Sequence, residues 1–267
     1  MNHLRRELAP IGDAGWAEIS NEATRSLKHF LAARKLIEVS GPLGWSASTV
    51  DLGHVSPIEG PAAGVEAAQR QALALVELRT PFEISLAVLD DAERGAADLD
   101  LDVVVDAARV AALAEDGSVF HGYAAGGLPG LAQASPHEPI DIADDYDDYP
   151  RSTAKAVAVL RAAGVDGPYA IALGSRCYTG VIESTEHGGY PVFDHLKMIL
   201  GGPVVWAPAV DGAVVLSQRG GDFELLIGQD FSIGYRGVDA TAAQLYLEES
   251  IAVRINSPEA AVRLAYP

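Results

Sequence analysis

The stretch Gln218–Tyr235, QRGGDFELLIGQDFSIGY, is the most informative part of the chain. It pairs with a second stretch near the N-terminus, Leu4–Ile19, which has the sequence LRRELAPIGDAGWAEI. Neither stretch has the residue spacing of a catalytic motif. In the first, Gly220 and Gly221 precede a β-rich run and predict a tight turn in which the Asp222 side chain bonds the backbone. Both stretches therefore predict structural elements rather than a catalytic site.

Composition limits the class of protein. The chain has 267 residues, 49% of them hydrophobic and 21% charged, so it can bury a real core in one large domain or two modest ones. The formal net charge of -18 is unfavourable for wrapping nucleic acid, because phosphate binding needs Lys and Arg. A single cysteine, Cys177, excludes an intrachain disulfide and fits a reducing cytoplasm. No apolar run has the length of a signal peptide or a membrane span, so we expect a cytoplasmic protein without a membrane partner.

Hydrophobic periodicity predicts two long helices. Apolar residues recur three and four positions apart over 13–33, where Asp13 is the expected N-cap. The same pattern recurs over 99–121. Between the helices, Pro and Gly residues interrupt 46–72, which we interpret as an extended loop or hairpin. The chain is expected to return through a strand-like run at 73–89.

The rest of the chain alternates short helices with β-rich runs. We expect strands at 35–39, 167–174 and 242–255, and helices at 152–163 and 194–200. Helical and strand runs are mixed without the regular strand–helix–strand alternation of a doubly wound sheet. The sequence therefore favours an α+β fold.

Three groups of residues are candidates for chemistry, and none forms a complete motif. The run GGLPGL (126–131) lacks the Lys-Ser/Thr pair of a phosphate loop and favours a plain turn. His187 and His195 lack a metal-ligand spacing pattern with other residues, so no metal site is expected. Cys177 and His187 are the residue types of a nucleophile pair, although a lone Cys after an apolar run is typical of a small buried residue.

The order of short motifs resembles that of the encapsulin (linocin-like) family 1 shell proteins, over nearly the whole chain. Its most specific piece is Gly228-Gln229-Asp230 followed by Ser232-Ile233-Gly234-Tyr235. Leu8-Ala9-Pro10 followed by Trp16 looks like the N-terminal arm and first helix of the family. Further pieces are Arg34-Lys35, Gly41-Pro42, Glu77-Leu78-Arg79, Pro81-Phe82, Glu93-Arg94-Gly95, Glu115-Asp116 and Gly167-Pro168-Tyr169.

The resemblance implies a particular α+β architecture, the Hong Kong 97-type phage capsid fold with a peripheral domain, an axial domain and an extended loop. It places the N-terminal arm and first helix at 1–40 and the extended loop at 41–80. The peripheral domain with the long helix is expected at 81–130 and 222–267, and the axial domain at 131–221. The Pro- and Gly-rich part of the loop cannot easily bury its own backbone, which agrees with a partner chain there.

The resemblance also implies a structural function. We expect a self-assembling icosahedral nanocompartment of 60 or more copies of this chain, without nucleic acid. It would enclose a cargo enzyme, a dye-decolourising peroxidase or a ferritin-like iron oxidase, bound through a C-terminal targeting peptide, with roles in iron storage and oxidative stress. We expect no catalytic residue. Two other classes stay open: a soluble acidic hydrolase or protease that uses Cys177 or Asp222, and a binding module of low oligomeric order.

Two sites follow from the resemblance. The targeting peptide is expected in a groove between the first helix and the peripheral sheet, lined by Leu27, Phe30, Leu31, Arg34, Leu36, Glu38, Phe231, Ile233 and Tyr235. A pore, most simply at the five-fold axis, is expected to be lined by Glu183, Ser184, Thr185, Glu186, His187, Gly188, Gly189 and Tyr190. Some relatives bind a flavin beside a Trp where this chain has Ala87, so neither flavin nor another cofactor is expected here.

Overall fold

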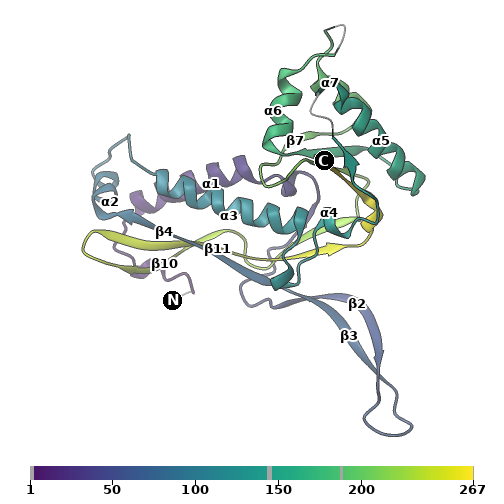
Figure 1. Ribbon diagram of the computed structural model, residues 1–267. Coiled ribbons are helices and arrows are strands. Elements are labelled where there is room, and N and C mark those ends of the chain that lie inside the picture. The colour runs from purple at the N-terminus through teal and green to yellow at the C-terminus, as the bar shows by residue number, and fades with distance from the viewer. Residues whose placement is uncertain (1–2, 143–145, 187–188, 267) are drawn as a thin grey trace.

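The computed structural model describes residues 3–142, 146–186 and 189–266. In these residues the strands form two five-stranded sheets and a separate two-stranded hairpin (Figure 1). Helices accompany both sheets, so the chain has the α+β architecture that the sequence predicts. No helix of the described part is both long and apolar enough to cross a membrane.

The first sheet is organised around one long strand, β11 (Ala242–Ile255). One edge of β11 pairs with β4 (Val76–Ser85), and the other pairs with β10 (Ser232–Val238) and then with β9 (Phe223–Ile227). A short parallel strand, β1 (Glu38–Ser40), extends the sheet beyond β9. The alternation along β11 places Ala243, Leu245 and Leu247 on one buried face.

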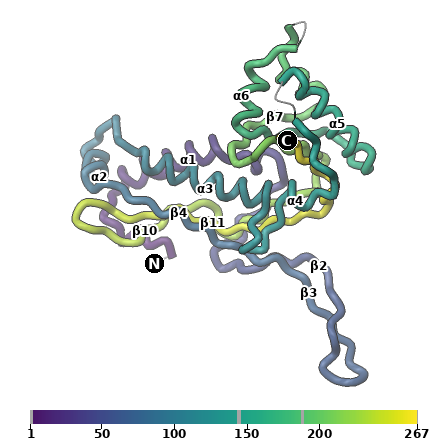
Figure 2. Tube along the Cα trace, viewed as in Figure 1, coloured from purple at the N-terminus to yellow at the C-terminus, as the bar shows by residue number. Residues whose placement is uncertain are grey.

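Two long helices cover that buried face. Helix α1 (Asp13–Phe30) and helix α3 (Asp102–His121) run side by side over the sheet, and α2 (Leu86–Glu93) lies at the far end (Figure 2). Their apolar stripes, including Ile19 and Val104, form one core with the inner residues of β4, β10 and β11. The periodic spacing that predicts the two long helices is therefore the spacing that buries them.

The second sheet has the strand order β5 (Ile140–Asp141), β12 (Ala261–Ala265), β8 (Ala213–Ser217), β6 (Tyr169–Leu173) and β7 (Val204–Trp206). Strands β6 and β8 are buried along their whole length because both faces are covered. The helices of this part are α4 (Leu131–Ala134), α5 (Tyr149–Ala162), α6 (Ser175–Glu183) and α7 (Val192–Leu200). Short 3-10 helices lie at Arg6–Leu8, Ala33–Lys35, Ala124–Gly126, Tyr146–Asp148 and Pro258–Ala260.

The hairpin of β2 (Thr49–Ile58) and β3 (Ala67–Ala74) projects away from both sheets (Figure 1). None of its strand residues is buried. Val55, Ile58 and Val65, which a core would normally cover, are 62%, 52% and 50% exposed. The interpretation of this stretch as an extended hairpin is confirmed, and these three side chains are left largely open to solvent.

Two local predictions are wrong, and one helix was missed. The strand-like run at 73–89 ends at Ser85, and residues 86–93 form α2, because the Ser85 hydroxyl accepts a hydrogen bond from the Ala87 N–H and caps a helix there. Helix α6 was not expected. Asp13 is the first helical residue rather than the N-cap, which is Gly12. The predicted domain boundaries stay a prediction, although β12 belongs to the second sheet and not to the first.

Candidate functional site

The residues predicted to bind a targeting peptide come from the end of α1, the segment that leads to β1, and the start of β10. They divide into two sets by exposure. Leu27, Leu31, Leu36 and Ile233 are buried and at most 8% exposed, so they belong to the cores of this chain. Phe30, Arg34, Phe231 and Tyr235 are half-buried, and Glu38 is exposed. Only this second set offers side-chain surface to a ligand.

Arg34 joins three elements through acidic partners. Its guanidinium bonds Glu115 of α3, lies 2.9 Å from an Asp230 carboxylate oxygen, and lies 3.4 Å from Glu249 of β11. The guanidinium carbon also lies 5.1 Å from the ring centre of Phe231. Burial, and then the Glu115 carboxyl beside it, raise the pKa of Glu249 well above its usual value. Arg34 is therefore held by the fold, and it is not a free cation for a ligand.

Asp116 fixes the turn that carries Arg34. Its carboxylate accepts hydrogen bonds from the backbone N–H groups of Ala32 at 2.8 Å and Ala33 at 2.9 Å. The carboxyl is buried, and burial raises its pKa to about 7 against the opposing effect of the two backbone donors. The end of α1 is thus tied to the middle of the chain by a buried acid.

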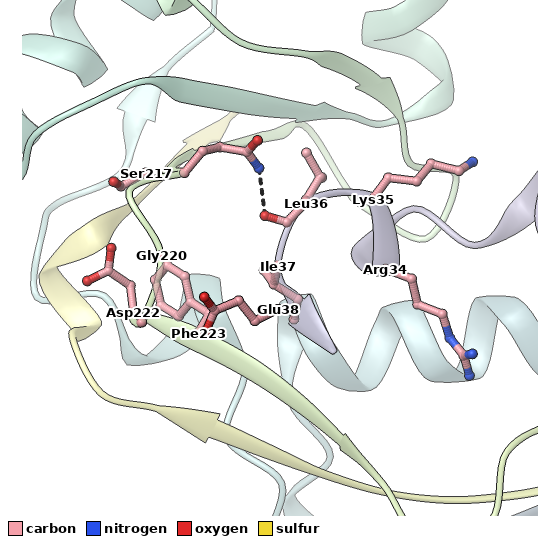
Figure 3. A pocket seen from close by; sticks show the side chains of 11 residues that line it. Arg34, Lys35, Leu36, Ile37, Glu38, Ser217, Gly220, Asp222 and Phe223 are labelled. Carbon is pink, nitrogen blue, oxygen red and sulfur yellow. Dashed lines mark hydrogen bonds between the residues drawn. The ribbon is translucent and has the colours of Figure 1, made fainter. Parts of the chain in front are cut away.

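A polar cavity of about 240 Å³ opens beside this turn (Figure 3). The segment Arg34–Glu38 lines one side of it, and Ser217–Phe223, without Arg219, lines the other. The Gln218 amide donates to the Leu36 carbonyl at 2.7 Å and joins the two sides. In Figure 3 the Arg34 guanidinium extends away from Asp222. The cavity therefore presents Lys35, Glu38 and backbone groups to solvent.

The two candidate nucleophiles have structural contacts. Gly220 and Gly221 have φ of 89° and 78°, which confirms the predicted tight turn. The prediction that the Asp222 side chain bonds the backbone is wrong, because its carboxylate accepts from the Arg219 guanidinium at 2.7–3.2 Å. Cys177 is buried, and its sulfur lies 3.1 Å and 3.2 Å from the phenol oxygens of Tyr149 and Tyr266. The proposed base, His187, lies outside the described residues.

The predicted pore residues lie between α6 and α7, at the tip of the second sheet's helices. We call residues 183–190 the tip loop; its His187 and Gly188 lie outside the described residues. The Glu186 N–H donates to the Tyr190 carbonyl at 2.8 Å, and the Glu186 carboxylate lies 2.7 Å from Nδ1 of His195. Within the described ranges no three His, Cys, Asp or Glu side chains form a metal-binding group.

Comparison with known proteins decides the family. The family model described as Linocin_M18, encapsulating protein for peroxidase, matches residues 1–252. A type 1 encapsulin shell protein of Rhodospirillum rubrum is 50% identical, and the match covers 99% of this chain and 96% of that protein. The chain belongs to the encapsulin shell proteins. Another member, from Rhodococcus erythropolis, is 44% identical over 99% of this chain and 100% of its own length.

Solved structures confirm the Hong Kong 97-type capsid fold of this encapsulin chain. A virus-like particle from Pyrococcus furiosus superimposes with a TM-score of 0.65 at 16% identity, covering 92% of this chain and 97% of the other. A chain of the solved structure of Mycobacterium phage Bobi gives a TM-score of 0.61 at 13% identity, and the match covers 89% of this chain and 91% of that chain. The encapsulin is a structural, capsid-like shell protein and not an enzyme, so the alternative hydrolase at Cys177 or Asp222 is set aside.

Proposed function

We propose that this encapsulin assembles into a closed icosahedral shell of 60 or more copies in the cytoplasm. The observation that carries the proposal is the β2–β3 hairpin, which leaves its apolar residues exposed and is far too extended to be stable alone. A neighbouring copy is the natural cover, since closed symmetric assemblies repeat one contact. With 28.0 kDa subunits, 60 copies have a mass of about 1.7 MDa.

Particle mass tests this proposal directly. Purified protein at neutral pH and micromolar concentration is expected to elute as a megadalton species and to form hollow spheres under the electron microscope. A stable species of one or two chains under these conditions would contradict the proposal. Native mass spectrometry then distinguishes 60 copies from a larger shell.

The shell's proposed content is a cargo enzyme, either a peroxidase or a ferritin-like iron oxidase, held by a short C-terminal peptide. The half-buried rings of Phe30 and Phe231 supply apolar contact, and exposed Glu38 supplies a charge beside the polar cavity. Burying two or three aliphatic side chains of the peptide stabilises one contact by about 1.5–3 kcal/mol each before ordering costs. Several copies on an oligomeric cargo then add avidity.

Cargo loading is tested by one variant at half-buried Phe231 and one at exposed Glu38, because replacing buried Ile233 would disturb the core. Phe231→Ser and Glu38→Lys are expected to yield intact shells with less co-purified cargo. Glu18→Lys, an exposed charge change elsewhere on α1, is the matched control and retains cargo. Full loading in both test variants would contradict the proposed surface.

We propose further that the shell binds no flavin at the position of Ala87. Ala87 is exposed in the first turn of α2 and has no ring on which a flavin could stack. Purified shells are therefore expected to lack flavin absorbance near 450 nm, and Ala87→Trp is the variant that would supply the missing ring. Stoichiometric flavin in the unaltered shell would overturn this.

A further inference from the structure

A second, larger cavity lies beside the N-terminal residues and strands β4, β10 and β11. Its volume is about 910 Å³, and we call it the arginine cavity. It is lined by His3, Arg5, Trp45, Arg79, Pro81, Tyr235, Arg236 and Tyr246. Three arginines face this space and none of its lining residues is acidic, on a chain whose formal net charge is -18. The cavity is therefore a local concentration of positive charge on an acidic protein.

Two of the arginines are available to an anion. Arg5 and Arg236 are exposed, and within the described residues neither side chain makes a hydrogen bond or an ion pair. Arg79 differs, since its guanidinium bonds Glu248 at 2.6 Å and lies 3.0 Å from Glu77. The other oxygen of Glu248 lies 3.1 Å from Nε2 of His3. Arg79 is thus held by the acidic residues beneath the cavity.

Aromatic rings lie next to these charges. Trp45 is 55% exposed although it is a large apolar side chain, and the His3 ring stacks on it with centroids 4.5 Å apart and an interplanar angle of 10°. The guanidinium carbon of Arg79 lies 5.0 Å from the ring centre of Tyr246. A planar ligand can join such a stack at low entropic cost because its face is apolar and rigid.

The backbone at Arg5 adds an independent observation. Its φ is 53°, and among the described residues it is the one non-glycine residue in the left-handed region. This conformation is unfavourable for a side chain with a Cβ, and such residues cluster at ligand-binding sites. The hydrogen bond from the Tyr235 N–H to the Leu4 carbonyl, 2.8 Å long, holds the segment beside β10. The fold therefore presents Arg5 to the cavity at a local cost.

We propose that the arginine cavity binds a mononucleotide, that is, a small ligand with one aromatic ring system and one phosphate. The guanidinium forks of Arg5 and Arg236 match the geometry of phosphate oxygens, and Trp45 stacks on the base. The cavity volume falls in the range of sites that hold small molecules. This cavity shares Tyr235 with the predicted cargo groove, and none of its lining residues belongs to the tip loop.

Isothermal titration of the assembled protein with adenosine 5′-monophosphate tests the proposal. The two parts of the ligand, adenosine and inorganic phosphate, are titrated in parallel. The nucleotide is expected to bind at least tenfold more tightly than either part, and more weakly as salt rises. Equal binding of the nucleotide and phosphate would reduce the cavity to an anion site and overturn the proposal. Absence of nucleotide binding at millimolar concentration would overturn it as well.

Variants locate the binding. Arg236→Gln and Trp45→Ala are each expected to weaken nucleotide binding about tenfold, the usual effect of losing one charged or one stacking contact. Arg151→Gln makes the same change at an exposed arginine on α5 and is expected to have no effect. Trp45→Phe keeps an aromatic ring and is expected to retain nucleotide binding. It serves as the test at this position if the Trp45→Ala variant assembles poorly. Unchanged affinity in both Arg236→Gln and Arg5→Gln would contradict the assignment.

Discussion

The Nε atom of Arg34 donates to both carboxylate oxygens of Glu115, at 2.9 Å each. Glu115 is completely buried in α3, while Arg34 follows α1 in the sequence. The contact therefore connects the two long helices at the point where the chain turns toward the first sheet. Glu249 of β11, also buried, shares the same guanidinium.

Replacing Arg34 by Met is expected to destabilise the subunit by about 3–5 kcal/mol, because Glu115 and Glu249 stay buried without their cation. The measurement is the thermal midpoint together with the yield of assembled particles. Arg25→Met is the matched control, since Arg25 pairs with Glu22 at the surface and its loss is expected to change little. Equal losses of thermal stability in the two variants would show that burial of the acidic partners does not determine the cost of losing the arginine.

Stability is expected to fall as pH rises from about 4 to about 7 through the titration of Asp116. Its pKa is about 7 in the folded chain, against an ordinary value of 3.8, so the folded state binds the extra proton in this range. The contribution is about 4 kcal/mol at most. The Asp116→Asn variant lacks this contribution. The free energy of unfolding is measured against pH for both proteins, and subtracting the variant's values from those of the wild type removes the contributions of the other titrating groups. A difference profile that is flat between pH 4 and 8 would refute the assignment.

Deleting the β2–β3 hairpin is expected to leave a folded but unassembled subunit. The Leu75 N–H donates to the Ser48 carbonyl at 3.0 Å, so a short Gly-Ser linker can replace residues 49–74. Circular dichroism is expected to keep the helical signal while size-exclusion chromatography shows small species. A variant that shortens only 60–64 serves as the control for loop length. Intact shells from the full deletion would mean that the hairpin is not the main contact.

Gly212→Ala is expected to destabilise the second sheet by about 1–3 kcal/mol. Gly212 has a φ of 78°, and a Cβ there would collide with the Leu264 carbonyl oxygen of β12. Gly95→Ala is the control, because Gly95 has a φ of 84° and open space around its Cα. A larger loss of thermal stability at position 212 than at position 95 measures the effect of the collision. Equal losses would mean that backbone strain alone explains both variants.

Glu186→Gln is expected to slow the entry of divalent cations into a loaded shell about twofold or more, since a ring of carboxylates favours cations. The readout is the rate of iron uptake by encapsulated ferritin-like cargo. Glu138→Gln, at an exposed position outside the tip loop, is the control. An unchanged uptake rate with assembly intact would assign Glu186 a purely local role through its contact with His195.

The sequence predicted the elements with strong periodicity. Helices α1 and α3 and strand β11 follow directly from the spacing of their apolar residues. Helix α2 was missed because its apolar residues continue those of β4, although Ser85 is a recognisable cap. Helix α6 contains Thr, Gly and Val, which weaken a helical pattern, and it forms because the core covers Cys177 and Val181.

The candidate site was harder to predict than the fold. Leu27 and Ile233 have the same residue type whether they line a groove or a core, and only the packing shows that they are buried. The network of Arg34 joins positions far apart in the chain, so no local pattern contains it. Its one local signal was the acidic pair Glu115 and Asp116 among the apolar residues of a long helix.

Strand β12 inserts between β5 and β8, and it follows every other strand of the described chain. A chain still growing on the ribosome therefore keeps β8 as an open edge until residues 261–265 have left the exit tunnel. Helix α5 packs against β12 and cannot settle on a finished sheet before that moment, whereas α6 and α7 pack on β6 and β7, which come earlier in the chain. The order of synthesis therefore leaves the α5 side of this sheet incomplete until β12 has been made, while the two helices that flank the tip loop already have their strands.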